Sequence, residues 1–366
     1  MAPTDGVPAV VRDAGIRGGE EPFVLLISDR PALRRSLARG IAVVMPCRGV
    51  ADVRRLDGRR PDLVVIDLSA EAVDGALLEA DRARGGPIPR LVLRRAGSPP
   101  VPPSPFSRSL PAGASHETIL AAVFAMIEAA AERNRRLVAR GEAATGIVAE
   151  MFDSAALGAG LQQADTDRGT EIVLDAVSEA GIGAWLATVW RHDSGVYQHT
   201  LGVAGYAAAF GARIGLCRPD HHRLTKAALL HDIGKARIPS EILNKPTRLS
   251  PEELRLMRRH PDIGAALLDA QGGFEPAVVA VVRHHHERID GTGYPAGLCG
   301  SAIPDLVRIV AICDVFSALT ERRPYRQPVA APEALATMAR VRGHLDGALT
   351  KAFAPVVLSA VPATTG

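Results

Sequence analysis

Short apolar runs alternate with longer polar stretches over the first hundred residues of the chain. Residues 23–27, 63–66 and 90–93 form three such runs, and the segments between them have the length of helices. Buried strands that alternate with helices are typical of a parallel α/β sheet. We therefore predict an α/β domain over residues 22–115, preceded by a flexible tail at residues 1–21.

The pattern changes near the end of this domain. Residues 97–111 are rich in proline and serine, which predicts a loop in place of the last regular elements. Residues 116–150 are rich in alanine and charge, with apolar positions such as Ile119 and Val123 at helical spacing, and predict a long connecting helix. Such a helix either pairs with its copy in a homodimer or packs on its own domain, and both readings stay open.

Helix signals dominate residues 151–354. Ser250-Pro251-Glu252-Glu253 combines an N-cap, a proline at the first helical position and a capping-box glutamate. Pro261 opens a further helix, which Gly272-Gly273 ends. We predict an all-α domain here, followed by a flexible tail at residues 355–366.

Composition narrows the classes of function. A net charge of +3 and an aromatic content of 4% argue against a protein that coats nucleic acid. No apolar stretch reaches the length of a membrane span, and residues 1–20 lack the core of a signal peptide. The four cysteines have neither disulfide nor metal spacing, which suits a reducing compartment, so we expect a cytoplasmic protein.

Imidazoles and carboxylates gather in the helical part. Eight of the 11 histidines lie between positions 199 and 286, several of them beside acids. Neutral imidazole together with carboxylate suits iron, manganese or zinc, whereas calcium requires oxygen ligands. Seven groups exceed the ligand number of one ion and fit a two-metal site bridged by Asp232. The candidate ligands are His199, His231, Asp232, His260, His285, His286 and Asp314.

The motifs around these residues resemble a known family. Leu229-Leu230-His231-Asp232-Ile233-Gly234-Lys235 is followed in order by His260-Pro261, His285-His286-Glu287, Asp290-Gly291, Gly293-Tyr294-Pro295 and Arg323-Pro324-Tyr325-Arg326. Over about residues 185–350 the chain closely resembles the HD-GYP family of cyclic di-GMP phosphodiesterases, within the HD superfamily.

The resemblance implies a function and a role for each motif. It implies an HD-type helical domain that hydrolyses cyclic di-GMP to pGpG, GMP or both, with two divalent ions, iron or manganese, that supply a hydroxide. The same seven residues become the metal ligands. The residues assigned to catalysis are His231, Asp232 and Lys235; those assigned to substrate binding are Lys235, Gly293, Tyr294, Arg323 and Arg326.

One departure from the family concerns the number of metals. Some members carry a glutamate four residues before the first histidine ligand, one helical turn away, where it helps to hold a third ion. Gly195 occupies that position here. We therefore expect two metal ions rather than three.

The amino-terminal part resembles a response-regulator receiver domain, which has a flavodoxin-like fold. Residues 61–67 look like a phospho-acceptor strand that ends at Asp67, with Gly75 downstream. The match is incomplete, because Asp29 is the only acid after the first strand and Arg94 stands where a small hydroxyl residue is expected. Leu110-Pro111 likewise replaces an expected lysine before a proline. We read a degenerate receiver that favours dimerisation or partner docking over phosphorylation of Asp67.

Two other functions stay open on the sequence alone. A hydrolase of another phosphorylated nucleotide would keep the His-Asp core while making little use of the loop over residues 290–295. A sensor that binds cyclic di-GMP without cleaving it would not need seven metal ligands.

Overall fold

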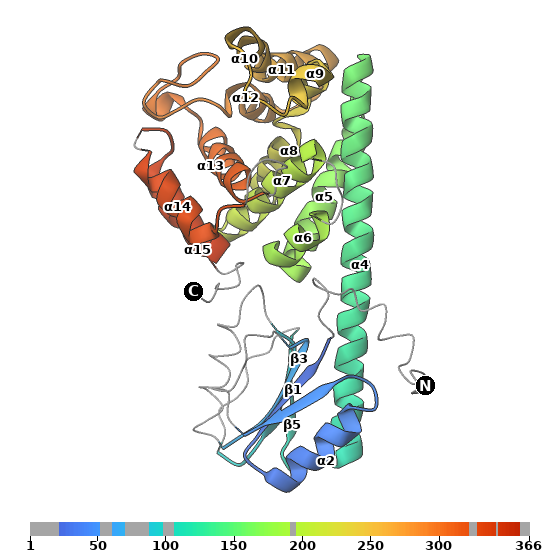
Figure 1. Cartoon of the computed structure of the whole chain (residues 1–366). Helices are drawn as coiled ribbons and strands as arrows, with labels where there is room; N and C mark the ends of the chain where they lie inside the picture. Colours follow the sequence, from blue (N-terminus) through green and yellow to red (C-terminus); the bar gives the residue numbers. More distant parts are fainter. Residues whose placement is uncertain are drawn as a thin grey trace. The chain divides into compact units, whose positions relative to one another are not determined.

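A computed structural model describes residues 22–51, 61–69, 88–97, 106–190, 195–321, 328–341 and 343–358. The chain divides into two compact units, Met1–Val138 with Pro362–Gly366, and Ala139–Val361 (Figure 1). The predicted tail at residues 1–21 and the last part of the predicted tail at 355–366 lie outside the described residues.

The first unit is a parallel five-stranded sheet in the order β2-β1-β3-β4-β5. This strand order is that of flavodoxin-like folds, so the predicted α/β class is confirmed. The register pairs Ser28 with Asp67, which brings the ends of β1 and β3 together. The elements are β1 (Val24–Ser28), α2 (Pro31–Ile41), β2 (Cys47–Val50), β3 (Leu63–Asp67), β4 (Arg90–Arg94) and β5 (Ser107–Pro111).

Both faces of this sheet are buried, which explains the uninterrupted apolar runs of β1 and β3. One face packs against α2 and the first part of α4 (His116–Leu157). The other face, with Ile27 and Ile66, packs on Leu68 and Ile88.

Two strands differ from the sequence prediction. The predicted loop over residues 97–111 is wrong at its end, where Ser107–Pro111 forms β5, and β2 has no counterpart in the prediction. Both are edge strands and are only partly buried, so neither carries an apolar run.

The second unit contains helices and one isolated β-bridge among its described residues, which confirms the predicted all-α class. Within its described part, no helix combines the length and apolarity that a membrane span needs, and the same holds for the first unit. The elements are α5 (Gln163–Ala180), α6 (Ile182–Val189), α7 (Gly195–Arg213), α8 (Arg218–Leu230), η2 (Ile233–Arg237), α9 (Ser240–Leu243), α10 (Pro251–Met257), α11 (His260–Gln271), α12 (Pro276–His284), η3 (Gly300–Ala302), α13 (Asp305–Thr320), α14 (Ala331–Arg340) and α15 (Gly347–Leu358).

Several predicted boundaries are tested by these elements. The capping box at Ser250 is present, and Gly272 ends α11 with a φ of 73°. The connecting helix continues beyond residue 150 to Leu157, and α15 includes residues 355–358, which were expected to belong to a tail.

The helix α4 passes through the boundary between the two units. Ile119 and Val123 belong to the core of the first unit, and Ile147, Val148 and Met151 are buried in the part assigned to the second. The apolar side of α4 is therefore covered by the chain itself.

A close approach between two segments positions the helices of the second unit. A Cβ on Gly234, in η2, would collide with the carbonyl oxygen of His260 and lie 2.6 Å from the amide nitrogen of Gly264. Only glycine allows η2 and α11 to meet at this separation. The contact places the start of α11 beside the segment that follows α8.

We predict that Gly234→Ala destabilises the second unit by about 3 kcal/mol, because the added methyl group meets backbone that cannot move aside alone. Gly146→Ala is the matched control: Gly146 is exposed in α4, and no atom lies within 4 Å of its added Cβ. The control should leave stability unchanged or raise it by up to about 1 kcal/mol. Urea unfolding measures both, and equal stability of the two variants would contradict the proposed close approach.

Candidate metal centre

The seven candidate ligands come from five different segments and meet in one place. His199 lies in α7, His231 is the C-cap of α8, Asp232 follows it, and His260 begins α11. His285 and His286 follow α12, and Asp314 lies in α13. All are buried except His286, which is partly exposed. The structure thus brings together every ligand expected from the sequence.

The carboxylate of Asp232 lies at the middle of this group. Its Oδ1 is 3.2 Å from Nε2 of His260 and 3.7 Å from Nε2 of His285. Its Oδ2 is 3.3 Å from Nε2 of His231 and 3.7 Å from Nε2 of His199. Each oxygen therefore faces a different pair of imidazoles, which is the arrangement expected of a carboxylate between two cations.

The ring orientations of three histidines are set by backbone carbonyls one turn earlier. Nδ1 of His231, His260 and His285 lies 2.7, 2.8 and 2.9 Å from the carbonyl oxygens of Ala228, Met257 and Val282, respectively. A carbonyl oxygen only accepts hydrogen bonds, so Nδ1 carries the proton and the Nε2 lone pair of each neutral ring points inward.

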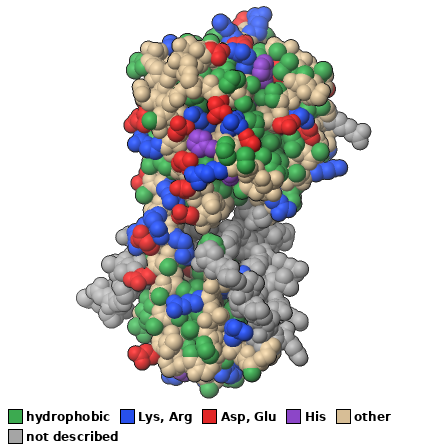
Figure 2. Space-filling model, turned by 180° about the vertical axis from the view of Figure 1, so that it is seen from behind, with side chains coloured by type: hydrophobic (Ala, Val, Ile, Leu, Met, Phe, Trp, Pro, Cys, Tyr) green, Lys and Arg blue, Asp and Glu red, His purple; other side chains and the backbone are tan. Residues whose placement is uncertain are grey.

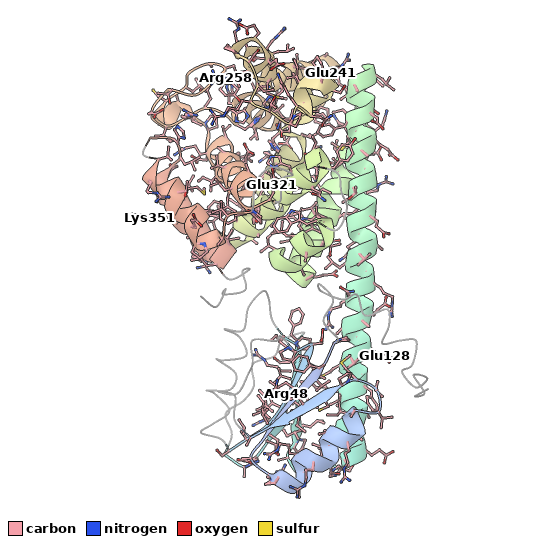
Figure 3. All side chains as sticks on the ribbon, in the orientation of Figure 1. Arg48, Glu128, Glu241, Arg258, Glu321 and Lys351 are labelled. Atoms are coloured by element: carbon pink, nitrogen blue, oxygen red, sulfur yellow. The ribbon has the colours of Figure 1, made fainter. Side chains whose placement is uncertain are left out.

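Glu321 orients the fourth ring and was not expected from the sequence. Its Oε2 is 2.8 Å from Nδ1 of His199, whose Nε2 is 3.0 Å from Oδ1 of Asp314. Glu321 is the C-cap of α13 and lies inside the helical unit (Figure 3). The contact joins residues 122 positions apart, and no local motif marks it.

Burial and the nearby acids decide which charges the candidate site favours. Burial lowers the pKa of His285 well below its usual value and that of His286 to about 4, so both rings are neutral, as ligands must be. Burial also opposes protonation of His199, but Asp314 and Glu321 outweigh it and raise its pKa to about 9. The acids around His199 thus favour a positive charge beside them, whether a proton or a metal ion.

The donor set fits a metal. Nε2 of His231 and Oδ1 of Asp232 are buried and have no hydrogen-bond partner among the described residues. Unpartnered buried polar atoms are costly unless something else satisfies them. Three overlapping groups have their ligand atoms within 4.8 Å of one another: His260, His285 and His286; His199, His231 and Asp314; His231, Asp232 and His285.

Lys235 adds a cation to the centre. Its Nζ donates to Oδ2 of Asp232 at 2.5 Å, and its side chain is 22% exposed. Burial would raise the pKa of Asp232, but Lys235 holds it well below the usual range, so this carboxylate is ionised.

The loop after α12 folds back over the site. The buried carboxylate of Glu287 accepts hydrogen bonds from the backbone N–H groups of Ala296, Gly297 and Leu298 at 2.7 to 3.1 Å. A Cβ on Gly293 would lie 2.5 Å from Cα of Glu287, so this glycine serves a close approach within the loop itself. Tyr294 is thereby held with its ring centroid 4.8 Å from that of His286.

Two predicted substrate residues fall in a segment that the structure does not describe, and a glycine takes the family's glutamate position. Arg323 and Arg326 lie outside the described residues, as does Gly75 of the receiver-like domain. Gly195 begins α7, and its Cβ position is open, with no atom within 4 Å. Among the described residues, no carboxylate therefore occupies the position that would help hold a third ion.

In the first unit, Asp67 is fully buried and engaged by three side chains. Arg30 donates to Oδ2 at 3.0 Å and to Oδ1 at 2.8 Å, Arg95 donates to Oδ1 at 3.1 Å, and the Ser28 hydroxyl donates to Oδ2 at 2.6 Å. Burial opposes ionisation, but these donors lower the pKa of Asp67. Arg95 also pairs with Asp29, so two arginines lie among the acids at the ends of β1 and β3.

Residues 187–349 match the HD domain family. The chain is 38% identical to a cyclic di-GMP phosphodiesterase of Pseudomonas aeruginosa over 222 residues, 60% of this chain and 53% of that protein. It is 44% identical over 144 residues to the cyclic di-GMP phosphodiesterase response regulator RpfG of Xanthomonas campestris pv. campestris, 39% of this chain and 37% of the relative.

A third relative differs in its nucleotide. The chain is 39% identical over 142 residues to 3'3'-cGAMP-specific phosphodiesterase 1 of Vibrio cholerae, 39% of this chain and 33% of that protein. The chain spans about half or less of the length of these relatives. Together with the HD match, they confirm the resemblance of the helical part to the HD-GYP family.

We predict that Glu321→Gln lowers the affinity for a divalent metal about 10- to 100-fold, because the charged acceptor that orients the His199 ring becomes a neutral amide. Competition with a chromogenic chelator measures the affinity. Glu333→Gln, on the exposed start of α14, removes the same charge away from the centre and should bind metal like the wild type. Equal affinity of the two variants would show that Glu321 does not support the site.

Proposed function

We propose, from the match of residues 187–349 to the HD domain family, that the protein is a metal-dependent phosphodiesterase that hydrolyses cyclic di-GMP to pGpG, GMP or both. The observation that carries the proposal is the carboxylate of Asp232, whose two oxygens each face a different pair of buried imidazoles. A protein that only recognised the nucleotide would have no need for this arrangement.

We propose two divalent ions, iron or manganese, as the resident metals. One would be held by His199, His231 and Asp314, the other by His260, His285 and His286, with Asp232 shared. Imidazole and carboxylate donors together suit these metals. The open position at Gly195 supports two ions rather than three.

When bound, such a metal pair lowers the pKa of a water molecule and draws charge from the phosphate. The water oxygen bonds to phosphorus, the bond from phosphorus to the ribose 3′ oxygen breaks, and the proton ends on that oxygen. Lys235, fixed beside Asp232, would neutralise the charge that develops on a non-bridging phosphate oxygen.

The loop after α12 supplies the substrate contacts in this proposal. Gly293 and Tyr294 lie over the centre, where the tyrosine ring is 4.8 Å from His286. Arg323 and Arg326 would hold phosphate through the planar fork that arginine offers.

A second candidate substrate is 3'3'-cGAMP. The relative specific for it is about as similar to this chain as the first two cyclic di-GMP relatives are. Both nucleotides carry two phosphodiester groups in a ring, so the same metal centre serves either, and a comparison of kcat/KM for the two decides between them. A hydrolase of a non-cyclic nucleotide would cleave neither.

We predict that the wild type, purified without oxygen, carries about two iron or manganese ions and hydrolyses cyclic di-GMP. The double substitution His231→Ala with Asp232→Ala should abolish turnover and metal loading, because it removes the bridge and a ligand. Elemental analysis and chromatography of the products measure the two effects.

His222→Ala is the matched control, since His222 lies in α8 away from the centre and should keep full activity. A chelator should abolish the wild-type activity, and added manganese should restore it. Wild-type protein that binds the nucleotide without metal and never cleaves it would make this a sensor instead.

For the first unit we propose dimerisation or partner docking rather than regulation by phosphorylation. The carboxylate of Asp67 is already satisfied by Arg30, Arg95 and Ser28, and its full burial keeps it from a phosphoryl donor. The covered apolar side of α4 favours a dimer formed through the receiver-like domain over one formed through this helix.

We predict that acetyl phosphate with magnesium adds no phosphoryl group to the protein, as measured by intact mass. Asp67→Ala should lower the stability of the first unit by about 1–3 kcal/mol, because it removes the carboxylate partner of Arg30 and leaves Arg95 with Asp29 alone. Stoichiometric phosphorylation of the wild type that is lost in Asp67→Ala would show that the arginine pairs open readily.

A further inference from the structure

An arginine outside the expected motifs lies at the edge of the metal centre. Arg258 is the C-cap of α10, two residues before the ligand His260. Its guanidinium carbon is 5.2 Å from the ring centroid of Tyr294, and that ring in turn lies 4.8 Å from the ring of His286. A cation is thus held against the tyrosine that covers the centre.

The guanidinium of Arg258 is unused by the rest of the described chain. Its side chain is exposed and has neither a hydrogen bond nor an ion pair with any described residue, whereas Arg255 on the same helix pairs with Glu252 at 2.9 Å. The donors of Arg258 are therefore available to a ligand, and the contact with Tyr294 restricts where the guanidinium lies.

The proposed substrate leaves one phosphate without a partner at the metals. A cyclic dinucleotide carries two phosphodiester groups on opposite sides of its ring, and the metals with Lys235 engage the one that is cleaved. The other remains charged and needs cationic partners outside the centre, for which Arg258 is a further candidate besides Arg323 and Arg326. Arginine binds a phosphate with two parallel N–H donors and keeps its charge at any relevant pH.

We propose that Arg258 binds the phosphate of the cyclic dinucleotide that is not being hydrolysed, and that it does so as a substrate-binding residue positioned by Tyr294. This inference rests on the proposed phosphodiesterase function. It adds a contact that selects substrates with two phosphates over simple phosphodiesters. Because this contact is present before and during hydrolysis, its loss affects KM more than kcat.

The test compares Arg258→Ala, Arg258→Lys and Arg255→Ala with the wild type on two substrates. Cyclic di-GMP has the second phosphate, and bis(p-nitrophenyl) phosphate does not. Arg258→Ala should raise KM for cyclic di-GMP about tenfold with little change in kcat, and leave kcat/KM for the simple diester within about twofold. Arg258→Lys should fall between, since it keeps the charge and loses the fork, and Arg255→Ala should match the wild type.

Metal content and Tm of the Arg258 variants should equal those of the wild type, which separates substrate binding from damage to the centre. An unchanged KM for cyclic di-GMP in Arg258→Ala, or an equal loss on both substrates, would overturn the proposal. A wild type that cleaves the simple diester but leaves every cyclic dinucleotide intact rejects the proposed function itself, and the role of Arg258 with it.

Discussion

The carboxylate of Asp232 is the group on which the arrangement of the helical unit depends. It is ionised, almost fully buried and within 3.7 Å of four imidazoles and one ammonium group. A buried charge of this kind is tolerated only when cations or donors surround it. Four other segments have to converge on the end of α8 to provide them, and this requirement explains why most ligands lie at helix ends.

Helix ends suit this purpose because their backbone groups are not all used within the helix. His231 and His285 are C-caps, and His260 is the first residue of α11. Each ring uses a carbonyl one turn back for Nδ1 and turns Nε2 toward Asp232. The glycine contact between η2 and α11 then brings His260 close enough to contact the same carboxylate. The arrangement of the candidate ligands therefore depends on this backbone packing.

In the first unit, the carboxylate at the end of a strand is paired with arginines of the same chain. Asp67 occupies the edge of the sheet where doubly wound folds bind ligands, yet Arg30 and Arg95 neutralise it from within the chain. On the visible face of the helical unit, acidic and basic side chains lie next to one another (Figure 2).

The sequence by itself determined the two fold classes, the central strands, the helix capped by Ser250 and the seven residues that gather at the candidate metal centre. The strands and the cap are local features, because apolar runs and capping residues can be read within a few turns of chain. The seven residues follow from the clustering of histidines beside acids and from the resemblance of their motifs to a known family. Tertiary structure alone decided the edge strands β2 and β5, which are held by backbone hydrogen bonds and carry no apolar pattern. It also decided the division of the Asp232 oxygens between two histidine pairs, the support of His199 by Glu321 and the contact of Arg258 with Tyr294. Each of these joins segments far apart in the chain, and their separation in space is set by how the helices pack.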